Sequence, residues 1–261
     1  MKSTERVLAT VDDDRSIPDG PGDQRGLGVV VPYDFALDRE LWRWIPDEVT
    51  LLITRTPNLG LPVTLKMLEQ VSDHKVVARG VRDVLAGDPE AVTYLCTSGS
   101  FLGGIAGERQ LRRVIEQAGA PAAITPSGSL IDALRALDIA RVAVATPYTE
   151  TVTARLVAYL GEADVDVVGA AQLGMVDRIA ALRYHEVAEL VRAAVTPAAE
   201  AIFVSCTNVP CFDAIGPLER ELGIPVLTAN QVAIWGALNA IGLPPARAAD
   251  GLDQSLWTCP A

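Results

Sequence analysis

The 261-residue chain is poor in several residue types that common functions require. Only 5% of its residues are aromatic, two are histidine, and 22 Lys and Arg face 33 Asp and Glu, for a formal net charge of −11. Nucleic-acid binding needs a basic surface that neutralises phosphates, so this charge argues against nucleic-acid partners. An anionic substrate would have to be held by local hydrogen-bond donors rather than by the overall field of the protein.

Long apolar runs are also missing. No stretch approaches the roughly 18–20 apolar residues of a membrane span, and no basic segment followed by an apolar one opens the chain. We therefore expect a cytoplasmic protein with no membrane partner. The Gly-Lys-Ser/Thr ending of a phosphate loop and a full GxGxxG are absent too, so no nucleotide cofactor is predicted.

Cysteine is scarce, and its spacing excludes two common uses. The four cysteines (Cys96, Cys206, Cys211 and Cys259) form no CxxC pair, and two histidines give a zinc site little support. A disulfide framework is not expected in a long chain without a secretory signal. The sequence therefore predicts free thiols and no metal or other cofactor.

The chain is rich in short apolar runs, since 49% of its residues are hydrophobic. Runs of four to six residues alternate with segments of helical period, which is typical of buried parallel strands in βαβ units. The fold class is therefore α/β, after a polar, disordered tail over residues 1–23. The expected strands are 28–31, 49–53, 92–95, 122–125, 142–145, 165–168, 202–205 and 226–228. The expected helices are 37–44, 65–86, 107–118, 129–137, 150–161, 175–195, 217–222 and 231–241.

An internal duplication organises these elements. Motifs of the first half recur in the same order in the second half: Pro32-Tyr33 as Pro147-Tyr148, Asn58-Leu59-Gly60 as Gln172-Leu173-Gly174, His74 as His185, Cys96-Thr97 as Cys206-Thr207, and Pro121 as Pro225. Several coincidences in one order indicate a tandem repeat of an α/β unit. Such a repeat is expected to pack as two lobes about a pseudo-twofold axis, with the active site in the cleft between them.

Both cysteines of the repeat follow predicted strands. Ligands of open parallel sheets bind outside the carboxyl ends of the strands, so Cys96 and Cys206 should face one cleft. One thiolate could remove a proton or add to a double bond while the other thiol delivers a proton from the far side. The following residues (Thr97, Ser98, Thr207 and Asn208) could bind a carboxylate, and helix starts should depress the thiol pKa values.

Simpler interpretations compete at each position. A cysteine at a strand end is often only a small buried hydrophobe, but two at equivalent positions of a repeat favour a function. Cys211 has no repeat partner, and the two histidines lie away from the strand ends, so none of the three is assigned a catalytic role. The phenols of Tyr33 and Tyr148 are candidate carboxylate ligands, or else aromatic residues that merely line the cleft.

These motifs resemble the aspartate/glutamate racemase superfamily, and within it the branch of maleate cis–trans isomerase and arylmalonate decarboxylase. The marks are Gly26–Pro32, Pro62-Val63-Thr64, Cys-Thr-Ser-Gly at 96, Thr146-Pro147-Tyr148 and Cys-Thr-Asn at 206. The resemblance implies two Rossmann-like lobes with exchanged C-terminal helices, which gives a first lobe of 24–125 plus 229–261 and a second of 126–228. It also implies that Cys96 is the nucleophile, Cys206 an acid/base and Tyr148 a carboxylate ligand, and that Thr97, Ser98, Thr207 and Asn208 are donors.

One position departs from the pattern. Maleate isomerases carry an asparagine shortly after the opening Val-Pro, whereas this chain has Asp34, and an acid is unfavourable beside a dicarboxylate. The expected function is therefore a cofactor-independent isomerase of small carboxylic acids of the maleate isomerase type. A two-base amino-acid or hydantoin racemase, an arylmalonate-type decarboxylase (associated with glycine at the position of Cys96) and a non-catalytic small-acid binder are the alternatives. A homo-oligomer is compatible with the sequence.

Overall fold

The structure is a computed structural model that describes residues 23–243 and 253–258. The first half contains β1 (Arg25–Val31), α1 (Asp38–Leu41), η1 (Trp42–Trp44), β2 (Val49–Arg55), α2 (Leu65–Val71), α3 (His74–Leu85), β3 (Ala91–Tyr94), α4 (Thr97–Phe101), α5 (Gly104–Gln117), β4 (Ala123–Ile124) and α6 (Pro126–Ala136). The second half contains β5 (Arg141–Thr146), α7 (Glu150–Glu162), β6 (Asp166–Gln172), η2 (Ile179–Ala181), α8 (Tyr184–Ala194), β7 (Ala201–Val204), α9 (Phe212–Leu222), β8 (Val226–Thr228), α10 (Ala229–Ala240) and α12 (Ser255–Thr258).

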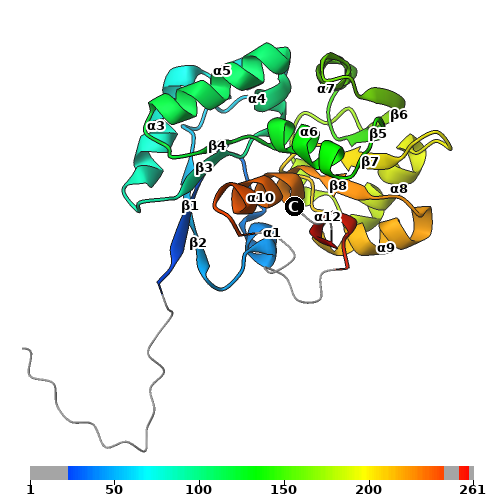
Figure 1. Cartoon of the computed structure of the whole chain (residues 1–261). Helices are drawn as coiled ribbons and strands as arrows, with labels where there is room; N and C mark the ends of the chain where they lie inside the picture. Colours follow the sequence, from blue (N-terminus) through cyan, green and yellow to red (C-terminus); the bar gives the residue numbers. More distant parts are fainter. Residues whose placement is uncertain (1–22, 244–252, 259–261) are drawn as a thin grey trace, which may run out of the picture.

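The strands form two separate parallel sheets with helices packed on them (Figure 1). The strand order is β2-β1-β3-β4 in the first sheet and β6-β5-β7-β8 in the second. Each order is the same permutation of its own half of the chain, so the predicted two-lobed α/β fold is confirmed. The predicted tail lies, apart from Asp23, outside the described residues.

Burial on both faces explains the apolar runs of the inner strands. From Leu27 to Val31 every residue of β1 is buried, as is every residue of β5 after Arg141. Helix α3 crosses β1 so closely that a Cβ on Gly80 would lie 2.6 Å from the side chain of Val30. The helix needs glycine at this position because a methyl group would separate it from the sheet.

The helix expected over 65–86 is interrupted, so that part of the prediction is wrong. α2 ends at Val71 and α3 starts at His74, because the backbone turns at Ser72 and Asp73. The carboxylate of Asp73 accepts hydrogen bonds from the N–H groups of Lys75 and Val76 and so caps the start of α3. The break directs α2 toward the carboxyl end of the first sheet.

The helix expected over 175–195 is also wrong in its first half. Residues 173–178 form a loop that leads into η2, and α8 begins only at Tyr184. Arg178 adopts a left-handed φ of 51°, and the N–H of Arg183 donates to the carboxylate of Glu186 at 2.8 Å at the start of the helix. The apolar residues before Tyr184 therefore belong to a loop at the carboxyl end of β6 rather than to a helix.

Two helices of the two halves meet at the centre of the molecule. α6 and α10 pack against each other, and α10 also contacts β3 and β4 of the first sheet as well as β8 (Figure 1). The predicted division into 24–125 plus 229–261 and 126–228 assigns the segment after residue 228 to the first lobe. That assignment requires contact between α10 and the first sheet.

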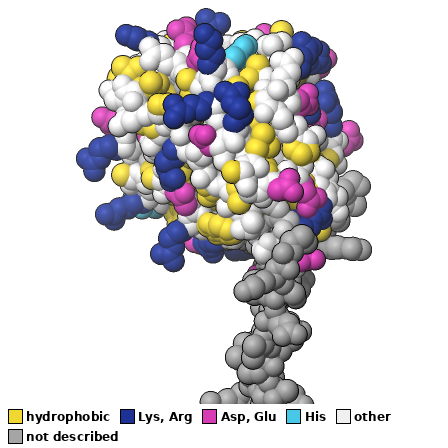
Figure 2. Space-filling model, turned by 90° about the vertical axis from the view of Figure 1, so that its left-hand side faces the viewer, with side chains coloured by type: hydrophobic (Ala, Val, Ile, Leu, Met, Phe, Trp, Pro, Cys, Tyr) yellow, Lys and Arg dark blue, Asp and Glu magenta, His cyan; other side chains and the backbone are white. Residues whose placement is uncertain are grey.

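On the face shown in Figure 2, Lys and Arg side chains are interspersed with acidic and apolar ones. No helix within the described residues is long and apolar enough to cross a membrane.

Candidate active site

The two cysteines of the repeat occupy equivalent positions, and both line one cavity. Cys96 lies two residues after β3, and Cys206 lies two residues after β7. The structure therefore brings together the strand ends that the sequence predicted. The cavity is lined by Pro32, Asp34, Val63, Met67, Leu68, Cys96, Thr97, Ser98, Tyr148, Ile179, Cys206, Thr207 and Asn208.

Tight packing fixes the thiol of Cys96. The hydroxyl of Ser98 lies 4.0 Å from Cys96 Sγ, and a Cβ on Gly99 would lie 3.1 Å from that sulfur and 2.9 Å from the Tyr94 hydroxyl. That hydroxyl is anchored, since it donates to the carbonyl of Val71. Glycine at 99 thus lets the first turn of α4 approach the sulfur.

Backbone strain accompanies the thiol of Cys206. Its φ is 95°, a region that L side chains rarely adopt, whereas Cys96 is extended with φ −137° and ψ 103°. The N–H of Asn208 donates to Cys206 Sγ over 3.4 Å. The unusual backbone conformation at Cys206 is typical of functional positions that the surrounding structure holds in place.

The side chain of Asn208 has a different role from the one that its sequence position suggested. Its Oδ1 accepts the N–H of Ala36 at 3.0 Å, and its Nδ2 donates to the carbonyl of Asp34 at 3.1 Å. Both ends of the side-chain amide therefore hydrogen-bond to the loop after β1 and connect that loop to the second lobe. Of the hydrogen bonds of Asn208 within the described residues, only the one from its backbone N–H reaches a candidate catalytic group, the thiol of Cys206.

Tyr33 and Tyr148, the equivalent tyrosines of the repeat, have different surroundings. The hydroxyl of Tyr148 is buried in the cavity wall without a hydrogen-bond partner of regular geometry, and its ring packs against Phe101. Tyr33 is absent from the lining, and its hydroxyl donates to the carbonyl of Leu61 at 2.8 Å and accepts the N–H of Leu61 at 3.2 Å. The structure therefore places Tyr148, but not Tyr33, at the site.

Unpaired buried hydroxyls mark where a polar ligand group fits. The hydroxyl of Thr97 has no hydrogen-bond partner, and that residue is 1% exposed, like Tyr148. Unsatisfied buried polar groups are costly, so native proteins keep few of them without a reason. Both hydroxyls are candidate donors to a ligand carboxylate. Thr207 also lines the cavity, and its carbonyl accepts from the side chain of Asn230.

Both thiols are neutral at physiological pH in the unliganded protein. Burial raises the pKa of Cys96 to about 11 and that of Cys206 to about 12, and the charge of Asp34 raises both further. The expectation of depressed thiol pKa values is therefore wrong for this state, because desolvation outweighs the hydrogen bonds that favour the thiolates. The largest of those for Cys206 is the bond from the N–H of Asn208.

Two loops cover the cavity, and sequence reasoning missed their residues. Val63, before α2, and Ile179, in η2, supply apolar walls from the two lobes, and the N–H of Val63 donates to the carbonyl of Val176 at 2.7 Å. Val63 belonged to a noted motif, but Ile179 was hidden in an expected helix. The cavity volume of about 20 Å³ is room for little more than one water molecule, so the walls of the cavity have to move before a substrate fits.

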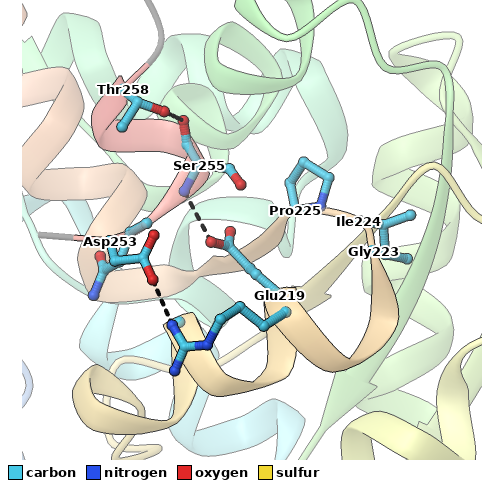
Figure 3. A pocket seen from close by; sticks show the side chains of 10 residues that line it. Glu219, Gly223, Ile224, Pro225, Asp253, Ser255 and Thr258 are labelled. Atoms are coloured by element: carbon cyan, nitrogen blue, oxygen red, sulfur yellow. Dashed lines mark hydrogen bonds and ion pairs between the residues drawn. The ribbon is translucent and has the colours of Figure 1, made fainter.

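A larger cavity of about 330 Å³ lies beside α9 and α12, and none of the described residues that line it is a cysteine (Figure 3). Its charged groups serve each other or the backbone: Arg220 pairs with Asp253, and Glu219 accepts the N–H groups of Val226 and Ser255. We therefore place the candidate active site at the smaller cavity.

In the described part of the chain, no group of three or more His, Cys, Asp or Glu is arranged to hold a metal ion.

Comparison with known proteins supplies the family. A family model described as arylmalonate decarboxylase matches residues 58–252, most of the chain. Arylmalonate decarboxylase of Bordetella bronchiseptica is 31% identical over 181 residues, which are 67% of this chain and 72% of the relative. The chain belongs to the arylmalonate decarboxylase family. Maleate isomerase of Nocardia farcinica is 26% identical over 238 residues, 85% of this chain and 92% of that protein.

Solved structures agree with this family assignment. A liganded double mutant of arylmalonate decarboxylase, with a glycine changed to cysteine and a cysteine to serine, superposes with a TM-score of 0.77 at 27% identity, over 84% of this chain and 93% of the other. A mutant of the Nocardia farcinica maleate isomerase with a covalently bound succinylcysteine intermediate has the same fold, with a TM-score of 0.80 at 23% identity and coverages of 91% and 99%. The branch that the sequence motifs resembled is therefore confirmed for this family member.

Proposed function

We propose that this chain is a cofactor-independent isomerase of small carboxylic acids that uses Cys96 and Cys206. The observation that carries the proposal is that cysteines at equivalent ends of two duplicated sheets line the same cavity. The maleate isomerase relatives support it, and so does the succinylcysteine intermediate found in one of them. Arylmalonate decarboxylase is a relative at similar identity, so the reaction itself has to be tested.

In the maleate-type reaction the thiol of Cys96 loses its proton and the sulfur adds to C2 of the cis double bond. The electron pair of that bond moves toward the neighbouring carboxylate, and the former double bond becomes a single bond that can rotate. Elimination of the thiolate then restores the double bond in the trans form. The proton of Cys96 passes to solvent before addition, the thiol of Cys206 donates a proton to C3 of the adduct, and its thiolate takes one back as Cys96 leaves as the thiolate, so no proton is gained or lost between addition and elimination.

Hydroxyl groups hold the substrate in this scheme. Thr97 and Tyr148 donate to a carboxylate and stabilise the negative charge that develops there, since their hydroxyls are buried and unpaired. The N–H of Asn208 stabilises a thiolate at Cys206. Because burial raises the pKa values of both thiols, the proposal requires that ionisation of Cys96 is coupled to substrate binding.

A two-base racemase is the second candidate, and a specific observation favours it. Asp34 lies in the cavity lining, and within the described residues no cationic side chain does, so a dicarboxylate would meet an acid. In this reaction one thiolate removes the proton from the carbon beside the carboxylate, and the opposite thiol returns a proton to the other face.

Two assays separate these reactions. Conversion of maleate to fumarate, followed by ¹H NMR, tests the first, and deuterium uptake at the α-carbon of amino acids tests the second. Cys96→Ala and Cys206→Ala should each lower the active reaction by at least ~100-fold. Cys211→Ala is the matched control, because that buried thiol donates to the carbonyl of Val209 and does not line the cavity.

Turnover that survives Cys96→Ala would reject the proposed use of both thiols. Carbon dioxide release from an arylmalonate that survives Cys96→Ala but not Cys206→Ala would instead identify a decarboxylase. Binding of small acids without any conversion would identify a non-catalytic binder.

A further inference from the structure

The charge inside the cavity is one-sided. Asp34 is the only charged residue among those that line the cavity in the described part of the chain. An anionic substrate therefore meets one fixed acid and no compensating cation. Desolvation raises the pKa of the Asp34 carboxyl, although the residue as a whole is exposed.

The acid is held in place without being neutralised. The side chain of Asn208 bonds to the carbonyl of Asp34 and to the N–H of Ala36, which fixes the backbone on both sides of the carboxylate. Apart from the N–H of Asp34 itself, the carboxylate has no hydrogen-bond or ion-pair partner among the described residues. Two other acids of this lobe are paired, Asp38 with Arg55 and Glu90 with Arg25. A fixed but unpaired acid beside two thiols is suited to recognise a ligand group.

The ligand groups that suit this lining differ from those of a dicarboxylate. One carboxylate fits the unpaired hydroxyls of Thr97 and Tyr148. A second one would share the small cavity with Asp34, where like charges repel, while an ammonium or N–H group would be attracted. The charge of Asp34 acts on both Cys96 and Cys206, so a substrate at the thiols lies within its reach.

We infer that Asp34 determines substrate specificity, and that the substrate is a small monocarboxylate with an ammonium or other N–H donor group that faces Asp34. The inference rests on the proposed function only in placing the substrate against the two thiols. It assigns Asn208 as the positioning residue that holds the acid, and it predicts that dicarboxylates are poor ligands.

Binding can be tested without turnover, using four-carbon probes that differ in charge. The full-length protein is treated with iodoacetamide in the presence of succinate, butyrate, 2-aminobutyrate or 4-aminobutyrate, and alkylation of Cys96 and Cys206 is measured by mass spectrometry. The variant is Asp34→Asn, which keeps the size of the side chain. Asp47→Asn is the matched control: it removes the same charge from the same lobe, but at an exposed turn before β2, at the opposite end of the strands.

In the wild type and in Asp47→Asn, the better aminobutyrate should protect at about a tenfold lower concentration than succinate or butyrate, the ratio that ~1.4 kcal/mol provides. Asp34→Asn should abolish this advantage and improve protection by succinate. Equal or better protection by succinate or butyrate in the wild type, an unchanged ratio in Asp34→Asn, or no protection by either aminobutyrate would overturn the inference. Deuterium uptake is a separate readout: aminobutyrate preference without uptake overturns only the proposed function, and turnover of a dicarboxylate without that preference overturns only the specificity.

Discussion

Glycine and alanine substitutions at the two cysteines should change stability in opposite directions. Cys206 has a φ of 95°, whereas Cys96 is extended. A Cβ in the first conformation costs about 1–3 kcal/mol, and glycine lowers stability by about 0.5–1 kcal/mol through the entropy of the unfolded chain. Cys206→Gly should therefore be more stable than Cys206→Ala by about 0.5–2 kcal/mol. Cys96→Gly should be less stable than Cys96→Ala by about 0.5–1 kcal/mol.

Urea denaturation of the four full-length variants measures these differences. Comparing glycine with alanine at one site cancels the loss of the thiol, so only the backbone preference and the Cβ remain. The slope of unfolding free energy against urea should be common to all four, which makes the midpoints comparable. If the alanine variant is more stable than the glycine variant at both sites, the strain assigned to Cys206 is refuted. The pair at Cys96 is needed because a difference at Cys206 alone would not separate backbone strain from packing.

Four further outcomes are expected. Because burial raises the pKa values of Cys96 and Cys206 to about 11 and about 12, iodoacetamide should react with both far more slowly at pH 8 than with a free thiol. The unfolded thiols ionise from about pH 8.5 while the folded ones stay protonated, so the free energy of unfolding should fall between about pH 9 and 11 by up to ~1.4 kcal/mol per pH unit per thiol, less so in the alanine variants. Tyr33→Phe should cost about 1 kcal/mol of stability, because its hydroxyl is hydrogen-bonded, and should have little effect on activity. Tyr148→Phe should lower activity but leave stability unchanged or increase it, because its hydroxyl is unpaired. Similar behaviour of the two variants in denaturation and in the isomerase assay would contradict this. The amide of Val63, which donates to the carbonyl of Val176 across the two loops, should lose protection from hydrogen exchange when a ligand separates the loops, and equal exchange with and without ligand would reject their role as a cover.

The fold could be predicted because it depends on patterns that are local in sequence. Buried parallel strands require continuous apolar runs, and a duplicated unit repeats them in order, so strands and lobes followed directly. Cys96 and Cys206 could be placed by the same reasoning, since strand ends of parallel sheets meet at one edge. The prediction of a helix over 175–195 was wrong in its first half because apolar residues there contact the cavity and the other lobe. Hydrophobic periodicity along the chain does not reveal such contacts.

Side-chain roles depended on contacts between lobes and could not be predicted in the same way. Asn208 follows a cysteine and looked like a substrate donor, but its amide is used by the loop that carries Asp34. Tyr33 and Tyr148 occupy equivalent positions, yet only the first meets a backbone group, at Leu61, that satisfies its hydroxyl. The depressed pKa expected for the thiols ignored desolvation, which depends on how completely the two lobes close over them.

Duplication gives the chain a symmetric scaffold, but the cavity that it encloses is asymmetric in strain, hydrogen bonding and charge. The strained cysteine belongs to the second lobe, the anchored tyrosine to the first, and the residue after each tyrosine is Asp34 in one half and Thr149 in the other. A symmetric site would bind a substrate in two equivalent orientations. An acid on one side removes that equivalence, because an ammonium group and a carboxylate then have different best positions. Thus the residue that departs from the family pattern is also the one that orients the substrate between the two thiols in our proposal.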